Sequence, residues 1–189
     1  VEEFVQRFKA EQPDGASLDA WSVGCSTGEE AYSLAMMINE QLNGGGRKLF
    51  YGITATDISL PTLAKPRKGE YPARRVLQVD PLLREKYFQP CGNEQTLAVT
   101  PVLRERICFA RLNVLDLSNA PMNDMDLIFC QNMLIYFRRW RKRQIVNRLA
   151  ERLAPGGILV LGPGEVTDWQ HPDLERIHFA DTLAFRRCR

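Results

Sequence analysis

The sequence of 189 residues predicts an α/β fold in which a mostly parallel, doubly wound sheet carries a small inserted β-subdomain and ends in an antiparallel strand. Two observations predict this fold. Short apolar runs alternate with segments whose apolar residues recur at helical spacing, which is the order typical of βαβ units. The turn Gly24-Cys-Ser-Thr-Gly28 joins the first apolar run directly to a helix, and open parallel sheets bind ligands at such turns.

The composition is that of one ordinary globular domain. Hydrophobic residues make up 44% of the chain and the formal net charge is +2, so neither a nucleic-acid partner nor a membrane is required. The five cysteines are odd in number and never spaced as C-x-x-C, and we expect neither disulfides nor a metal site. No apolar run approaches the about 20 residues needed to cross a bilayer. The N-terminus lacks a signal-peptide pattern, and we expect a cytoplasmic protein.

The first half of the chain is predicted to form a βαβ unit. Residues 18–23 have the pattern of a buried strand, and residues 29–42 carry apolar side chains at helical spacing. A second strand covers residues 49–56 and ends at Asp57, after which Ser59 is placed to cap a short helix. Because the two strands are parallel, the glycine turn and Asp57 fall at the same edge of the sheet.

Prolines interrupt this alternation between residues 66 and 111. After a helix predicted at residues 81–88, we interpret the segment from about 88 to 110 as the inserted β-subdomain, in which residues 96–99 and 106–110 pair as antiparallel strands.

The α/β pattern then resumes along the rest of the chain. Residues 125–130 are predicted to form a buried strand, and a helix extends from about Arg139 to Leu153. The turn Pro155-Gly-Gly157 ends this helix and leads into a strand at 158–161. A last pair of strands, around residues 177–179 and 183–185, closes the sheet.

The glycine turn differs from two common nucleotide sites. Ser26 occupies the position of the second glycine in a dinucleotide fingerprint, and Glu29 follows Gly28 where a P-loop has lysine. Glu29 and Glu30 would repel a polyphosphate and attract an amino group, although the helix dipole alone also favours acids at this position. The turn therefore suits a nucleoside that carries positive charge, such as S-adenosylmethionine.

Other polar residues follow the predicted strands. Asp57 is placed to accept hydrogen bonds from ribose hydroxyls, or else to cap the following loop. Asn113 could contact an adenine edge or satisfy its own backbone. Gln131 and Asn132 end the strand at 125–130, and Tyr136 is either a core aromatic or a hydroxyl near the reacting centre.

One charged motif stands apart from these residues. The run Arg138-Arg-Trp-Arg-Lys-Arg143 places five positive charges at a helix N-terminus, where the dipole disfavours them. A solvated helix face is the favoured interpretation, and a surface for an anionic partner is the alternative.

Four segments together resemble the chemotaxis receptor methyltransferases, the CheR family, over nearly the whole chain. The segments are residues 21–35, Ala55-Thr-Asp-Ile-Ser59 with the later Gly69-Glu-Tyr71, Arg111-Leu-Asn-Val-Leu-Asp116, and Asp126-Leu-Ile-Phe-Cys-Gln-Asn-Met-Leu-Ile-Tyr-Phe137. The resemblance implies a Rossmann-like class I methyltransferase fold with S-adenosylmethionine as cofactor.

The resemblance also implies roles for individual residues. Glu30 would hold the methionine amino group and Asp57 the ribose. Asn113 and Val114 would lie at the adenine, and Tyr136 would be the catalytic residue near the transferred methyl group. The residues expected at the cofactor are Gly24, Glu30, Asp57, Asn113, Val114, Cys130 and Gln131.

The reaction implied by the resemblance is methyl transfer to glutamate side chains of a chemoreceptor-type membrane protein, which gives glutamyl methyl esters and S-adenosylhomocysteine. A glutamate with an ordinary pKa of about 4.3 is already an anion at neutral pH, so no general base is required. The expected partner is the cytoplasmic domain of such a receptor, without nucleic acid and without membrane insertion of this chain. In some members of the family the inserted subdomain docks a receptor tail peptide.

The chain departs from the family pattern in three places. Gln131 stands where the family usually has arginine, and Gly162-Pro-Gly-Glu165 replaces Gly-His-Ser-Glu. The family's N-terminal helical domain, with a catalytic arginine, has no counterpart before Val1, and we expect a cofactor-binding domain with weak activity. Two alternatives stay open: a non-catalytic signalling module that binds S-adenosylmethionine or S-adenosylhomocysteine, and a small-molecule methyltransferase.

Overall fold

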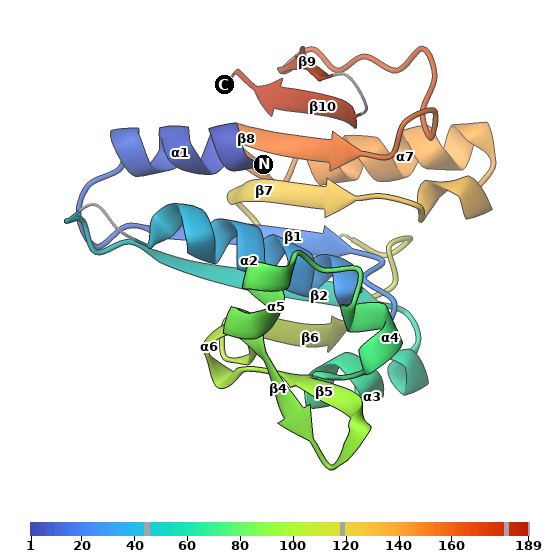
Figure 1. Cartoon of the computed structure of the whole chain (residues 1–189). Coiled ribbons are helices and arrows are strands. Elements are labelled where there is room, and N and C mark those ends of the chain that lie inside the picture. Colours follow the sequence, from blue (N-terminus) through green and yellow to red (C-terminus); the bar gives the residue numbers. More distant parts are fainter. Residues whose placement is uncertain (44–45, 118–119, 180–181, 189) are drawn as a thin grey trace.

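A seven-stranded sheet forms the centre of the molecule (Figure 1). The computed structural model describes residues 1–43, 46–117, 120–179 and 182–188. The strands lie in the order β6-β2-β1-β7-β8-β10-β9. Their bounds are β1 Ser17–Val23, β2 Phe50–Asp57, β6 Ile107–Arg111, β7 Met125–Cys130, β8 Leu153–Leu161, β9 Leu174–Phe179 and β10 Thr182–Arg187.

The sheet is mostly parallel, as the sequence predicts. Strands β6, β2, β1, β7 and β8 are parallel neighbours, whereas β10 is antiparallel to β8 and β9 is antiparallel to β10. From the central β1 the chain adds β2 and β6 on one side and β7 and β8 on the other. The crevice where the winding direction changes therefore lies at the carboxyl ends of β1 and β7.

Helices cover both faces of the sheet. The helices α1 (Glu2–Glu11), α2 (Glu29–Leu42) and α3 (Leu60–Lys68) contribute to one apolar cluster, and α7 (Arg139–Ala150) contributes to a second. Figure 1 shows α1 and α2 in front of the sheet and α7 behind it. Because successive strand side chains point to opposite faces, Ala20 belongs to the first cluster and Trp21 to the second.

Helix α2 follows the glycine turn and faces the sheet with an apolar stripe. Ala31, Leu34, Ala35 and Ile38 are buried at helical spacing, which is the pattern that predicts this helix. Gly28 is its N-cap residue and offers no side-chain hydrogen bond. The start of α2 is consequently held by the turn itself rather than by a capping side chain.

A second sheet of three antiparallel strands has the order β3-β5-β4, with β3 Glu70–Pro72, β4 Phe88–Cys91 and β5 Asn93–Val99. Short helices accompany it: α4 Ala73–Val76, α5 Pro81–Tyr87 and α6 Pro101–Arg104. The predicted pairing of residues 96–99 with 106–110 is wrong. Strand β5 pairs with β3 and β4, whereas β6 pairs in parallel with β2. The physical reason is that Ile107 and Phe109 are buried in the main core.

The helix predicted to reach Leu153 ends earlier. Helix α7 stops at Ala150, and Leu153 already begins β8, opposite Met125 of β7. The predicted turn Pro155-Gly-Gly157 is thus part of the strand, beside a register shift in β7 between Met125 and Leu127. Gly157 fits there because a Cβ would lie 2.8 Å from the Met125 carbonyl oxygen.

Two further elements lie outside the predicted ones. Helix α1 was not predicted, and it buries Phe4, Val5 and Phe8. A 3₁₀ turn, η1, covers Leu134–Tyr136 between β7 and α7. Within the described ranges, no helix combines the length and the apolar character that a bilayer crossing needs.

The small sheet packs on the main body through apolar side chains such as Val99, and polar side chains add to this attachment. Asn39 Nδ2 of α2 donates a hydrogen bond of 2.6 Å to the buried Tyr87 hydroxyl, which in turn donates to Glu40. Tyr71 of β3 donates through its hydroxyl to the Thr27 carbonyl oxygen at 2.8 Å. The second contact connects the small sheet directly to the glycine turn.

Candidate functional site

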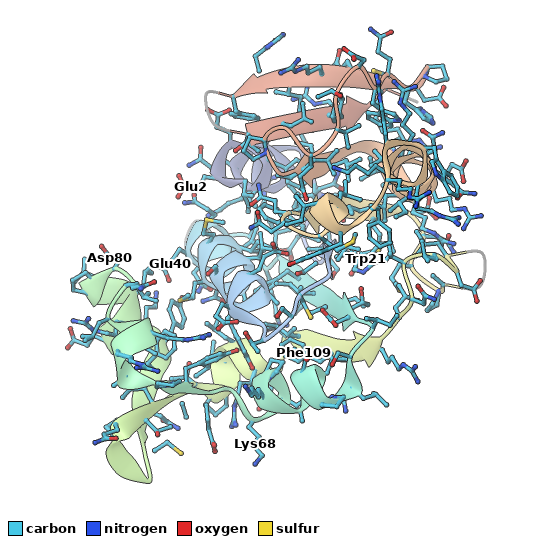
Figure 2. All side chains as sticks on the ribbon, turned by 90° about the vertical axis from the view of Figure 1, so that its right-hand side faces the viewer. Glu2, Trp21, Glu40, Lys68, Asp80 and Phe109 are labelled. Carbon is cyan, nitrogen blue, oxygen red and sulfur yellow. The ribbon has the colours of Figure 1, made fainter. Side chains whose placement is uncertain are left out.

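A hollow of about 610 Å³ opens at the carboxyl edge of the parallel strands. Figure 2 looks onto this edge of the molecule. The hollow is bounded by the segments that follow β1, β2, β6 and β7, so it occupies the crevice expected from the topology. Six of the residues expected at the site line it: Gly24, Asp57, Asn113, Val114, Gln131 and Tyr136.

The glycine turn is fixed in place by the neighbouring strand. The backbone N–H groups of Gly24 and Cys25 both donate to the Thr56 carbonyl oxygen, at 2.8 and 2.9 Å. Gly24 has φ +76°, and a Cβ there would lie 2.7 Å from the Met133 Cγ. Gly28 has φ +85°, and its Cβ would meet Pro66. The turn therefore requires glycine at both ends, for conformation and for space.

Asp57 lies where β2 reaches the hollow. One carboxylate oxygen accepts the Ser26 N–H at 3.0 Å, and the other accepts the Ser59 N–H at 2.9 Å. Ser59 in turn caps α3, since its Oγ accepts the Thr62 N–H at 3.3 Å. These bonds orient the Asp57 carboxylate between the glycine turn and α3. A carboxylate has about four acceptor positions, so it retains capacity for a ligand.

The two adjacent acids of the turn face different surroundings. Glu29 pairs with Arg75 and accepts a 2.5 Å hydrogen bond from Thr27 Oγ1. Burial alone would raise the pKa of Glu29, but its hydrogen bonds with Thr27, the backbone and Arg75 outweigh burial and lower the pKa. Glu29 is thus already neutralised by a partner within the chain.

In the part of the chain that the structure describes, Glu30 has no such cation beside it, and it accepts a hydrogen bond of 2.6 Å from Ser22 Oγ. Burial raises the pKa of Glu30 to about 7, the bond from Ser22 opposes this rise, and the negative charge of Glu165 adds to it. Glu30 lies behind the turn and does not itself line the hollow. Near neutral pH, a cation placed beside this carboxyl would favour its ionised form.

The loop after β6 brings Asn113 and Val114 to the hollow. Asn113 Oδ1 accepts the Leu115 N–H at 3.0 Å, which is the local turn expected of a loop asparagine. Its amide nitrogen takes no part in that turn. Asn113 therefore satisfies its own backbone and still borders the hollow.

The residues at the end of β7 divide between core and hollow. Cys130 is fully buried in the cluster on the α7 side, and its side chain does not line the hollow. Burial raises the pKa of the Cys130 thiol, with further contributions from Glu165 and Glu30. Gln131 does line the hollow. Tyr136, on η1, is 81% exposed at its mouth, which excludes the alternative of a core aromatic.

Glu165 does not line the hollow but holds η1, and the sequence analysis gave it no role. It is only 4% exposed. One of its carboxylate oxygens accepts the Leu134 N–H at 2.9 Å and the other accepts the Gly162 N–H at 2.9 Å. Glu165 thus ties the start of η1, which carries Tyr136, to the end of β8. The sequence signal that could have indicated a role for Glu165 is its position in the turn Gly162-Pro-Gly-Glu165, directly after a strand.

A second hollow, of about 640 Å³, lies between α1 and the sheet. Neither the glycine turn nor Asp57 borders it. The hollow of about 610 Å³ has both, and it is the candidate cofactor site.

Comparison with known proteins identifies the family. Residues 1–183 match the family described as CheR methyltransferase, SAM binding domain. The chemotaxis protein methyltransferase 1 of Pseudomonas aeruginosa is 40% identical over 154 residues, which cover 80% of this chain and 56% of that protein. The chemotaxis protein methyltransferase of Borreliella burgdorferi is 32% identical over 152 residues, 80% of this chain and 53% of that protein. The chain spans about half the length of these relatives.

Solved structures share the fold at low sequence identity. An N-methyltransferase from Bradyrhizobium japonicum in complex with S-adenosyl-L-homocysteine has a TM-score of 0.52 at 16% identity, covering 98% of this chain and 85% of its own. Magnesium protoporphyrin IX methyltransferase from Synechocystis with bound SAM has a TM-score of 0.52 at 14% identity, covering 98% and 77%. The fold is that of class I methyltransferases, and the chain belongs to the CheR methyltransferase family as its S-adenosylmethionine-binding domain.

Proposed function

We propose that this domain binds S-adenosylmethionine in the hollow at the carboxyl edge and methylates glutamate side chains of a chemoreceptor-type protein, giving glutamyl methyl esters. The observation that carries the proposal is that Gly24, Asp57 and Tyr136 border one hollow in a chain of the CheR family. The chemotaxis methyltransferases among its relatives support this choice of substrate.

The residues around the hollow fit such a cofactor. The Gly24 turn presents backbone without a side chain, and the Asp57 carboxylate has acceptor positions left for ribose hydroxyls. Asn113 and Val114 would contact the adenine. Glu30 would pair with the methionine ammonium group, whose positive charge would favour the ionised form of this buried carboxyl. These assignments put the ribose and the adenine against the segments that end β2 and β6, and the methionine ammonium group beside the first turn of α2.

The proposed reaction requires little of the protein beyond alignment of the methyl group with the acceptor oxygen. When bound, S-adenosylmethionine supplies a sulfonium methyl group whose carbon–sulfur bond breaks, with its electron pair going to sulfur, as the acceptor oxygen bonds to the carbon. Because a glutamate acceptor is an anion at neutral pH, no side chain of the domain has to remove a proton. Tyr136 at the mouth would position the acceptor carboxylate, and such alignment is itself a large contribution to rate.

The test is transfer of labelled methyl groups to receptor-containing membranes, followed by alkali treatment. We expect the label to be released as methanol, because esters are cleaved by alkali. The Asp57→Asn variant should bind S-adenosylhomocysteine about 10- to 100-fold more weakly, the cost of losing hydrogen bonds to a charged group. Asp124→Asn is the matched control, since Asp124 is exposed just before β7, at the opposite edge of the sheet. Label that resists alkali would contradict the ester product.

A further inference from the structure

Helix α7 begins with the basic run Arg138-Arg-Trp-Arg-Lys-Arg143, for which the proposed reaction gives no role. A helix that follows a parallel strand starts at the edge where that strand ends. The run consequently lies at the same edge as the cofactor hollow. In Figure 2 the orange α7 is viewed nearly along its axis, and nitrogen-tipped side chains surround it.

The run adjoins the cofactor hollow directly. Phe137 borders both that hollow and a smaller one of about 270 Å³, which is walled by Arg139, Lys142 and Arg143. Large apolar side chains are exposed beside these cations: Ile135 is 56% exposed and Trp140 is 58% exposed. We define the α7 basic surface as Ile135, Tyr136, Arg138, Arg139, Trp140 and Arg141.

Acidic side chains of the described residues neutralise little of the positive charge of this surface. In the described ranges, Asp168 is the one acidic side chain that pairs with the run, through an exposed contact of 3.1 Å with Arg139, and exposed pairs contribute little. Lys142 and Arg143 donate to backbone carbonyl oxygens, which carry no net charge. Arg141 lies over the Trp140 ring, 4.2 Å from its centroid. The first turn of α7 has no acid, and the dipole disfavours cations there, so helix stability does not explain the run.

We propose that the α7 basic surface docks an acidic, helical segment of the protein substrate across the mouth of the cofactor hollow. The proposal rests on the proposed function, because a methyl-accepting glutamate would arrive within such a segment. The arginines complement its acidic face, and Trp140 and Ile135 offer apolar contacts, as aromatic residues and arginine do in protein interfaces. A protein segment is favoured over a membrane surface because Tyr136 belongs both to the surface and to the hollow.

The test uses a synthetic helical peptide with glutamates at i, i+4 spacing on one face and leucines on the other, and a second peptide with glutamine in place of glutamate. Trp140 reports binding by its fluorescence, since Trp21 and Trp169 are both buried. We expect the glutamate peptide to bind and to be released by salt, which screens exposed charges beyond about 8 Å at physiological ionic strength. The glutamine peptide should bind at least about tenfold more weakly.

Variants locate the binding on the α7 basic surface. The double variant Arg138→Glu, Arg139→Glu should weaken peptide binding at least about tenfold, with unchanged affinity for S-adenosylhomocysteine. The matched control is Lys65→Glu, Lys68→Glu, a charge reversal of two exposed residues on α3, which lies on the other face of the sheet. Equal weakening by both double variants would overturn the proposal. Binding to phosphatidylserine vesicles through Arg138 and Arg139, without binding to the peptide, would overturn it as well.

The proposal of the docking surface and the proposal of the methyl-transfer reaction can be contradicted independently of each other. Methyl transfer with an unchanged KM for receptor membranes in the Arg138→Glu, Arg139→Glu variant would overturn the docking surface and leave the reaction intact. Arginine-dependent binding of the peptide without transfer to any glutamate would support the docking surface and contradict the reaction.

Discussion

Glu29 and Glu30 are adjacent in the sequence, but their surroundings give them opposite properties. Glu29 has Arg75 as a partner and keeps a lowered pKa. Among the described residues, Glu30 has the Ser22 hydroxyl as its hydrogen-bond donor rather than a cation, and burial raises its pKa to about 7. Because the folded pKa of Glu30 lies above its unfolded value, its contribution to folding stability is fully present below the unfolded pKa and is lost as pH rises through about 7. A bound ammonium group would reverse this preference.

The affinity for S-adenosylhomocysteine should therefore depend on pH through Glu30. Below pH 7 the carboxyl is mostly protonated, and affinity should fall by up to about tenfold for each pH unit. Above pH 7 the affinity for S-adenosylhomocysteine should not change with pH. We expect the Glu30→Gln variant to bind weakly and with little pH dependence, whereas Glu29→Gln retains the dependence. Calorimetry from pH 5.5 to 8.5 measures the affinity of both variants. If the affinity of Glu30→Gln changed with pH as steeply as that of the unmodified protein, the role of Glu30 would be contradicted.

Single residues of the site could be predicted where they follow a strand. The sequence places Asp57 and Asn113 directly after apolar runs, and both line the hollow. Cys130 occupies the last position of its strand, where the alternation turns its side chain into the core. Glu165 could not be assigned, because its partner Leu134 lies near it only after β7 and β8 have paired. Its second partner, Gly162, is three residues away in the sequence and gives no signal of a site.

At the scale of the elements, local sequence patterns predicted where strands and helices lie better than they predicted which strands pair with each other. Helix α2 agrees with its predicted bounds because its buried stripe has one clear period. Strand β6 was predicted as a strand but given the wrong partner. Its alternation of Ile107 and Phe109 with exposed residues fits either sheet, and only the parallel pairing with β2 buries both side chains in the main core.

The glycine turn is the element whose sequence is most constrained by space. Gly24→Ala adds a Cβ at φ +76° and 2.7 Å from Met133 Cγ. We expect a loss of stability of about 1–3 kcal/mol from backbone strain and overpacking together. Gly156→Ala is the control, because Gly156 has φ +79° and nothing within 4 Å of the added Cβ, so it shows strain alone.

A second substitution separates the two causes in the turn. Met133→Ala removes the Cγ that the new Cβ would meet at 2.7 Å and leaves only the Met133 Cβ, at 3.0 Å. The double variant should therefore lose less stability than the two single losses added, by about 0.5 kcal/mol or more. Urea denaturation of the unmodified protein, Gly24→Ala, Met133→Ala and the double variant measures this coupling. Additive losses, with Gly24→Ala no worse than Gly156→Ala, would show that Met133 does not pack on the turn.

At the scale of the whole molecule, Tyr71 of β3 and Tyr87 of α5 connect the small sheet and its helix to the main body at two different places. Tyr87 meets Asn39 and Glu40 on α2, away from the hollow. Tyr71 donates to the Thr27 carbonyl oxygen, inside the turn that borders the hollow. The small sheet therefore contacts the glycine turn through Tyr71, whereas the contact of Tyr87 with α2 lies away from the hollow.

This arrangement predicts different outcomes for two chemically identical substitutions. Tyr71→Phe and Tyr87→Phe each remove one hydroxyl group, so amide hydrogen exchange in β4 and β5 should become faster in both variants. Tyr71→Phe should also weaken S-adenosylhomocysteine binding by about fivefold, since a hydrogen bond contributes about 1 kcal/mol and here it holds the turn. Tyr87→Phe should leave binding unchanged. If both variants bind with the affinity of the unmodified protein, the small sheet does not support the turn, and the Tyr71 contact serves only to attach it.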